Sequence, residues 1–89
     1  MKIKFSPYFE KRLREISKRD KVLLRKINKQ FVLFINNSRH PSLRTHKLEG
    51  SLDNFWSISV NRSIRMIYRE VGDIAYFTDI GKHEEVYRK

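Results

Sequence analysis

The spacing of apolar residues changes from a helical to an alternating pattern near Gly50, and this change limits the folds open to the chain. Before it, Phe9, Leu13 and Ile16 recur at helical spacing, and a second such series follows in residues 24–35. After it, "FWSISV" and "IRMIYRE" alternate, as strands with one buried face do. The sequence therefore predicts an α+β fold in which helices come first and pack on one face of a later sheet.

The helix boundaries are indicated by local residues. Ser6 followed by Pro7 provides a capping hydroxyl and a ring suited to the first helical position, and Asp20 can cap a second, longer helix. "NNSRHPS" ends that helix, because Pro41 disfavours helical geometry in the residue before it. We expect the second helix to bury a stripe of five residues: Leu24, Ile27, Phe31, Phe34 and Ile35.

Four segments are expected to be strands. "KIKF" predicts a short N-terminal strand with Ile3 and Phe5 inward. Residues 55–60, 64–70 and 74–80 predict an antiparallel meander, with turns at "NRS" and "VGD". With 89 residues, the chain has room for one core, so a single domain spanning 1–89 is expected.

The charge balance favours a polyanionic partner. The chain has 20 Lys and Arg residues against 10 Asp and Glu, a net charge of +10. Solubility alone is the alternative, but it needs a net charge of only about 2–8 in a small domain. Many of these cations lie in "KRLREISKRDKVLLRK", where a solvated helix surface and long-range attraction to a polyanion both remain open.

Several classes of site and location are disfavoured. Without cysteine, the chain has neither disulfides nor thiolate metal ligands, and its distant histidines lack zinc-site spacing, so we expect no metal and no cofactor. The N-terminus lacks the apolar core of a signal peptide, and no apolar run approaches the roughly 18–20 residues that span a bilayer. The cytoplasm is therefore the expected location.

The strand pattern also predicts a polar sheet face. If Trp56 and its alternating neighbours pack beneath the helices, Ser57, Ser59, Arg65 and Arg69 are displayed together on the opposite face. Two guanidinium groups and two hydroxyls there are suited to holding phosphate oxygens. An ordinary solvated face is the alternative, and the central Arg65 is the stronger ligand candidate.

The three histidines differ in their candidacy for chemistry. His40 lies in a loop and is expected to be a bystander, whereas His46 precedes the meander and His83 follows it. Imidazole exchanges protons near neutrality, so two histidines beside Arg65 would suit metal-free RNA cleavage. A purely structural role for each histidine stays open.

Three motifs resemble the RelE/ParE superfamily of toxins from bacterial toxin–antitoxin pairs, and most closely its RelE and YafQ branches. They are "HKLEG", "WSISVNRSIRMIYRE" and "DIGKHEEVY", in that order, and the similarity extends over essentially the whole chain. The resemblance implies a RelE-like fold and a ribosome-dependent endoribonuclease that cuts messenger RNA, contacts ribosomal RNA and is held silent by a cognate antitoxin.

The resemblance also implies roles for individual residues. His46 and His83 match the acid/base histidines of the YafQ-like pattern, Arg65 matches the arginine used on the scissile phosphate, and Tyr87 matches the terminal aromatic that orients the nucleotide. These four form the expected catalytic set. The expected substrate-binding set is Ser57, Ser59, Arg62, Arg69 and Lys82.

The chain departs from both branches, which keeps alternatives open. YafQ-like toxins carry a histidine where this chain has Ser59 and an aspartate where it has Ser63. RelE-like toxins carry lysines at the positions that Ser57 and Ser59 occupy here. His46, His83 and Arg65 would then have to suffice for cleavage. One alternative is a ParE-like toxin acting by binding, for example on DNA gyrase, although such chains generally lack the paired histidines. The other is a degenerate toxin kept as a binding partner.

Overall fold

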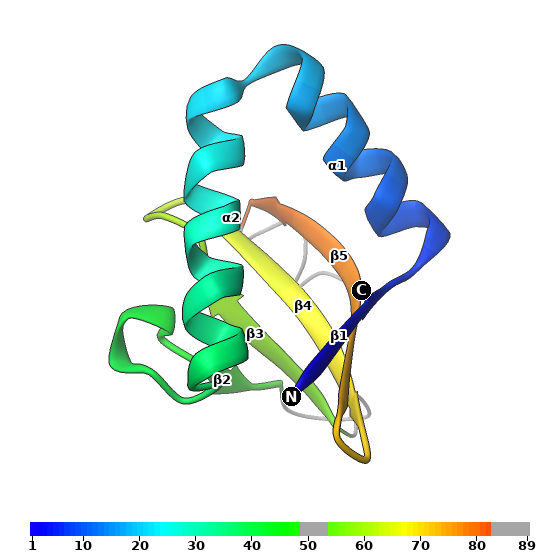
Figure 1. The fold of residues 1–89 in the computed structure, drawn as a ribbon, viewed down its shortest axis with the longest axis vertical. Coiled ribbons are helices and arrows are strands. Elements are labelled where there is room, and N and C mark those ends of the chain that lie inside the picture. The colour runs from blue at the N-terminus through cyan, green and yellow to red at the C-terminus, as the bar shows by residue number, and fades with distance from the viewer. Residues whose placement is uncertain (49–53, 83–89) are drawn as a thin grey trace.

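The structure is a computed structural model that describes residues 1–48 and 54–82, and within these it has the predicted α+β organisation (Figure 1). Two α-helices, one short 3₁₀ helix and five strands occur in the described ranges. Their bounds in chain order are β1 (Lys2–Phe5), α1 (Pro7–Arg19), α2 (Lys21–Asn36), η1 (Pro41–Leu43), β2 (His46–Lys47), β3 (Phe55–Ser59), β4 (Ile64–Val71) and β5 (Ile74–Lys82).

Both predicted helix caps are present. The Ser6 hydroxyl accepts a 3.0 Å hydrogen bond from the Phe9 N–H at the start of α1, and the Asp20 carboxylate accepts one of 3.0 Å from the Leu23 N–H at the start of α2. The Asp20 N–H also donates to the Ile16 carbonyl, so the same residue ends α1. One residue between the helices therefore sets a tight helical hairpin.

The described strands form one five-stranded sheet in the order β1-β5-β4-β3-β2. The meander β3-β4-β5 is antiparallel, as predicted. Its last turn is shorter than expected, because Val71 belongs to β4. Gly72, with φ of 60°, supplies the positive backbone angle that this turn needs. Two features were not predicted: β1 pairs parallel to β5, and the short strand β2 pairs with β3.

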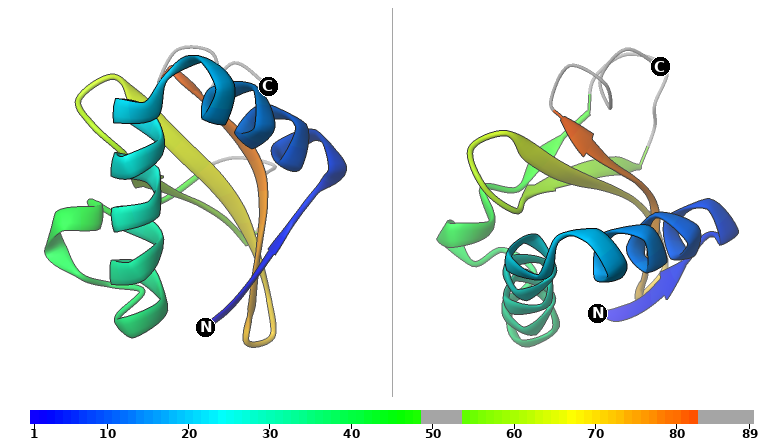
Figure 2. Two further views of the ribbon diagram at one scale, coloured as in Figure 1. Left: turned by 45° about the horizontal axis from the view of Figure 1, so that its top comes forward. Right: turned by 90° about the horizontal axis from the view of Figure 1, so that it is seen from above.

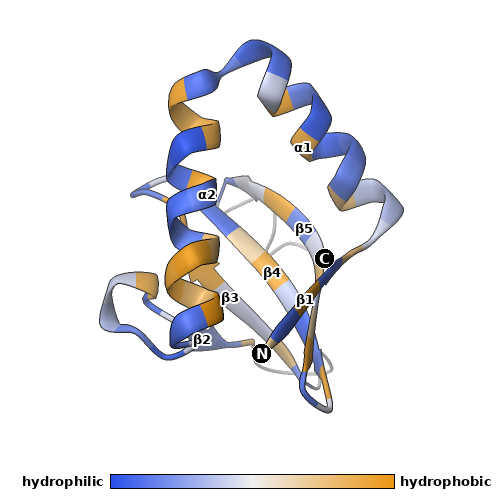
Figure 3. Ribbon diagram, viewed as in Figure 1, coloured by the Kyte–Doolittle hydropathy of each residue, from blue (hydrophilic) through white to orange (hydrophobic). Residues whose placement is uncertain are grey.

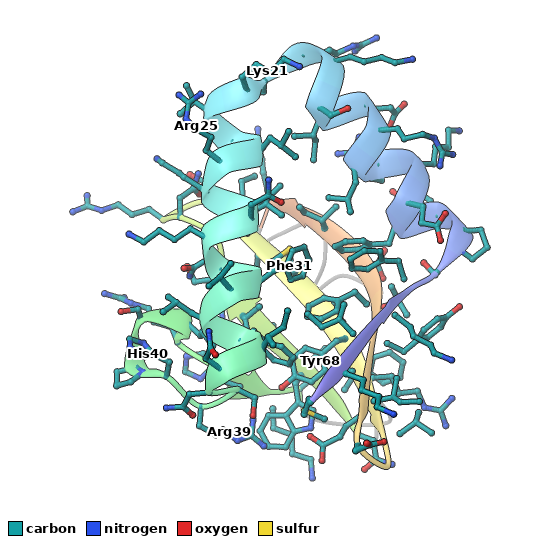
Figure 4. All side chains as sticks on the ribbon, viewed as in Figure 1. Lys21, Arg25, Phe31, Arg39, His40 and Tyr68 are labelled. Carbon is teal, nitrogen blue, oxygen red and sulfur yellow. The ribbon has the colours of Figure 1, made fainter. Side chains whose placement is uncertain are left out.

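Both helices pack against the same face of the sheet (Figure 2). Aromatic rings dominate the layer between them: the Phe31 and Phe77 centroids lie 5.1 Å apart in edge-to-face geometry, and the Phe34 and Tyr68 centroids lie 5.1 Å apart. Figure 4 shows Phe31 reaching from α2 into this layer, and Figure 3 shows apolar residues at intervals along α2. Neither helix in the described ranges is long and apolar enough to cross a membrane.

The predicted stripe on α2 is wrong at Ile35, whose side chain is 56% exposed. Each helical residue turns the chain by about 100°, so Ile35 points away from the core when Phe34 points into it. Gln30 lies on the buried face instead, with 6% exposure. Its amide nitrogen donates to the Ser59 carbonyl at 2.6 Å and the Ser42 carbonyl at 3.3 Å, which ties α2 to β3 and η1.

Trp56 packs against the core from its margin and is partly buried. The Arg39 guanidinium lies 4.0 Å from the ring centroid, and the Lys47 ammonium lies 5.8 Å from it. Because α2 ends at Asn36, a charged residue of the following loop contacts this ring at the end of the helical layer.

Candidate functional site

The face of the sheet away from the helices brings distant residues into rows. In the first row, His46 of β2 lies opposite Ser57 of β3, Ser57 lies opposite Ile67 of β4, and Ile67 lies opposite Asp79 of β5. His46 is exposed. In the pleat, directly opposed residues point to the same face, so His46 and Ser57 share this surface.

Arg65 occupies the next row, between Ser59 and Gly81. Its guanidinium is fixed at two edges: Nε donates to the Ser57 hydroxyl at 3.1 Å, and Nη2 donates to the Arg44 carbonyl at 2.6 Å. Within the described ranges Nη1 makes no hydrogen bond. The structure therefore holds one cation on the same face as His46, in the adjoining row.

Arg44 contributes its backbone carbonyl to the site. It follows η1 with φ of 47° and ψ of 54°, in the left-handed region that non-glycine residues seldom adopt. The carbonyl of this left-handed residue accepts the hydrogen bond from Nη2 of Arg65.

The predicted exposure of Ser57 is wrong, because the side chain has no accessible surface. Arg65 contacts its hydroxyl, and a second apolar cluster of Leu48, Ile67 and Phe55 lies along the same face. The face expected to be polar throughout is therefore divided. Ser57 orients Arg65 rather than presenting a free hydroxyl.

Arg69 is separated from Arg65 by this apolar cluster. It is exposed and lies opposite Phe55 and Tyr76. Four residues of strand correspond to about 13 Å. The structure therefore brings Arg65, but not Arg69, next to the row of His46.

The remaining predicted binding residues lie around the turn between β3 and β4 or at the end of β5. The Ser59 hydroxyl donates to the Asn61 carbonyl at 2.8 Å, and Ser59, Arg62 and Arg65 line an open pocket of about 470 Å³. Lys82 is exposed and lies opposite Ile64, which packs against the helix-side core. The pleat thus assigns Lys82 to the other face from Arg65.

His83 and Tyr87 lie outside the described residues, as does Gly50. His40 lies in the loop after α2 (Figure 4), and its Nδ1 accepts a 3.1 Å hydrogen bond from the Ser42 N–H at the start of η1. The structure thus gives this histidine a capping contact away from the row of His46.

The arginines of the pocket have no ion-pair partner in the described ranges. Three ion pairs occur in the described ranges, and they involve Arg12, Arg14 and Arg39, not the arginines of the pocket.

No group of three histidine, cysteine or acidic residues in residues 1–48 and 54–82 is arranged to hold a metal ion. Burial raises the pKa of the Tyr68 hydroxyl, opposed by the nearby charge of Arg39, but this group lies in the core.

Two contributors to the site were missed from the sequence. Arg44 gave no signal, since its role depends on a left-handed backbone and a contact with Arg65 21 residues away. Gln30 did give one: it falls on the apolar stripe between Ile27 and Phe34, and a polar residue at such a position predicts a buried hydrogen bond.

The fold matches solved bacterial toxins. YafQ of Escherichia coli BL21(DE3) is 23% identical, with 96% of each chain covered and a TM-score of 0.77. YafQ in the Escherichia coli DinJ–YafQ complex is 24% identical, with 96% of each chain covered and a TM-score of 0.78. The Staphylococcus aureus YoeB–YefM complex matches at 20% identity and a TM-score of 0.78, over 93% of this chain and 97% of that one.

The sequence comparisons agree with the resemblance expected from the motifs. No curated protein sequence matches the chain. The YafQ toxin family, described as bacterial toxins of type II toxin–antitoxin systems, matches residues 1–88. The chain therefore belongs to the YafQ family of type II toxins.

Proposed function

We propose that this toxin is a metal-independent endoribonuclease that cuts messenger RNA on the ribosome. The observation that carries the proposal is the placement of His46 and Arg65 in adjoining rows of one sheet face, with Ser57 bonded to the guanidinium between them. A proton-transfer group beside a fixed cation is what phosphodiester cleavage without a metal needs.

In the proposed reaction, one imidazole removes the proton of the RNA 2′-hydroxyl, whose oxygen attacks the adjacent phosphorus. The bond from phosphorus to the 5′-oxygen breaks, and a second imidazole protonates that oxygen. The products are a 2′,3′-cyclic phosphate and a 5′-hydroxyl. Arg65 stabilises the negative charge that develops on the phosphorane.

His46 and His83 are the proposed proton-transfer pair, and Tyr87 is proposed to orient the nucleotide. His83 follows two residues after Gly81, the residue opposite Arg65 in β5. Ser59 and Arg62 are proposed to contact substrate near the β3–β4 turn. Ser57 is proposed as a positioning residue, and Arg69 and Lys82 as more distant contacts.

We further propose that an antitoxin protein silences the chain. YafQ and YoeB have been crystallised as complexes named with DinJ and YefM, respectively. The net charge of +10 favours a partner with acidic segments, which would also compete with RNA for the basic surface. Action on ribosomes places the proposed activity in the cytoplasm.

The decisive experiment mixes purified toxin with ribosomes carrying a defined message and maps cleavage by primer extension. His46→Gln removes the proton-transfer group from an exposed position, so we expect cleavage to fall by about 10²–10⁴-fold with the fold intact. His40→Asn is the matched control, because asparagine retains a side-chain acceptor for the Ser42 N–H.

Two results would contradict the proposal. Undiminished cleavage by His46→Gln would remove His46 from the mechanism. Intact message from the wild-type toxin, with DNA damage in expressing cells, would favour the ParE-like alternative of action on DNA gyrase.

A further inference from the structure

Three arginines converge on the pocket beside the site. Arg44, Arg62 and Arg65 line this space of about 470 Å³, which we call the arginine pocket, and no acidic residue lines it. Its volume is in the range of pockets that bind small ligands. The three arginines come from different segments: the end of η1, the β3–β4 turn and β4.

The arrangement concentrates positive charge without internal compensation. No ion pair within the described ranges involves an arginine of this pocket. Like charges carried by residues around one space repel one another, and an anion held between them replaces that repulsion with attraction. The pocket therefore favours an oxyanion over a neutral or cationic ligand.

The walls of the pocket are held by contacts that do not depend on a ligand. Gln30, which is 6% exposed, bonds the Ser59 carbonyl and the Ser42 carbonyl on two sides of the space. Arg65 is fixed through the Ser57 hydroxyl and the Arg44 carbonyl. A site with such prior order loses less entropy on binding than one assembled from mobile side chains.

The turn that carries Arg62 is also ordered. The side-chain oxygen of Asn61 accepts 2.8 Å hydrogen bonds from the N–H groups of Ser63 and Ile64, which closes the chain around Arg62. Arg62 is exposed at this turn, so its side chain has access to a polyanion.

We propose that the arginine pocket binds a backbone phosphate of the RNA that neighbours the scissile phosphate. The inference rests on the proposed function, in which Arg65 contacts the scissile group. Arg65 lies between the row of His46 and the pocket, so Arg44 and Arg62 would hold the next phosphate along the strand. Binding two successive phosphates would fix the direction of the strand across the face.

The pocket is tested first with inorganic phosphate, titrated into the purified full chain and followed by amide NMR shifts. We expect saturable shifts around Arg44 and Arg62, and a loss of affinity of about tenfold in Arg62→Gln and in Arg44→Gln. Arg25→Gln is the matched control: it removes the same charge from an exposed position on α2 outside the pocket lining (Figure 4). Equal weakening by all three variants, or shifts that never saturate, would overturn the proposal.

The second experiment distinguishes a polynucleotide phosphate from a free one. Binding of a single-stranded oligonucleotide without 2′-hydroxyls, which cannot be cleaved, is measured over a range of salt concentrations. Each phosphate contact contributes about −0.7 to the slope of log affinity against log salt. We expect Arg62→Gln to reduce the slope by about that amount and Arg25→Gln to leave it unchanged. An unchanged slope in Arg62→Gln, with phosphate binding lost, would restrict the pocket to free phosphate and overturn the proposal.

Failure of this inference and failure of the proposed nuclease are distinguishable. If wild-type toxin cleaves message but binds phosphate no more tightly than Arg62→Gln, the pocket assignment is wrong and the nuclease stands. If phosphate and the oligonucleotide bind as expected but message stays intact, the nuclease is wrong and the pocket remains a polynucleotide-phosphate site.

Discussion

Arg65 donates a 3.1 Å hydrogen bond from Nε to the hydroxyl of Ser57, and that serine has no exposed surface. A strand residue expected to face solvent thus serves to orient a guanidinium group. The orientation matters because an arginine makes charge-assisted bonds along fixed directions in its plane.

Ser57→Ala tests this orienting role. The variant leaves Nε of Arg65 without its side-chain acceptor, so we expect cleavage to fall by about tenfold and the free energy of unfolding to fall by about 1 kcal/mol. Ser63→Ala, at an exposed position, is the control. Cleavage is measured on ribosomes and stability by urea unfolding. Full activity in Ser57→Ala would show that the two backbone acceptors, the carbonyls of Arg44 and residue 57, are enough to hold the guanidinium.

Gln30→Leu tests the link between α2, η1 and β3. The substitution keeps a similar volume but leaves the carbonyls of Ser42 and Ser59 without their donor, so we expect a loss of about 1–3 kcal/mol in the free energy of unfolding. Asn28→Leu on the exposed side of the same helix is the control. Equal urea midpoints for Gln30→Leu and wild type would contradict the assignment.

Phe34 and Ile35 are adjacent in sequence but differ in burial. Phe34 has no exposed surface and packs on Tyr68 and Phe77, so Phe34→Ala should lose about 3–5 kcal/mol of stability. Ile35 is 56% exposed, so Ile35→Ala should change stability by no more than about 0.5 kcal/mol. Chemical denaturation of the two variants measures the contrast, and similar losses would mean that α2 is rotated from the orientation described.

Tyr68 makes stability depend on alkaline pH. Burial raises the pKa of this hydroxyl above the usual value of about 10, so the folded chain keeps the proton at pH values where the unfolded chain releases it. The unfolded state then binds fewer protons, and the free energy of unfolding falls as pH rises above about 10. Tyr68→Phe should flatten this part of the stability profile. Tyr8→Phe, at a 51% exposed site, is the control, and equal flattening by both variants would contradict the assignment.

The features that could be predicted from sequence depend on short-range chemistry. Ser6 and Asp20 cap their helices through residues three positions away, and the β3–β4 turn is closed by Asn61 over the same span. Alternation likewise placed Met66 and Tyr68 in the core. Each of these outcomes is set by neighbours in the chain.

The features that could not be predicted depend on distant contacts. Nothing local specifies that β1 pairs with β5. Ser57 lies on the face that alternation predicts, but Arg65 of the next strand contacts its hydroxyl and its side chain is buried. For the site, the shared face of His46 and Arg65 follows from pleat and register, whereas the pocket depends on the left-handed backbone of Arg44.

The parallel pairing of β1 with β5 has a consequence for synthesis of the toxin. Lys2 lies opposite Ile74 and Phe5 opposite Phe77, so the first strand has no neighbour in the sheet until residues 74–77 have been translated. The helical hairpin can form early, since its contacts are local, but β4 gains its second partner strand only with β5. A nascent chain therefore passes most of its elongation without a finished sheet, because β5, which lies between β1 and β4, is the last described strand to be translated.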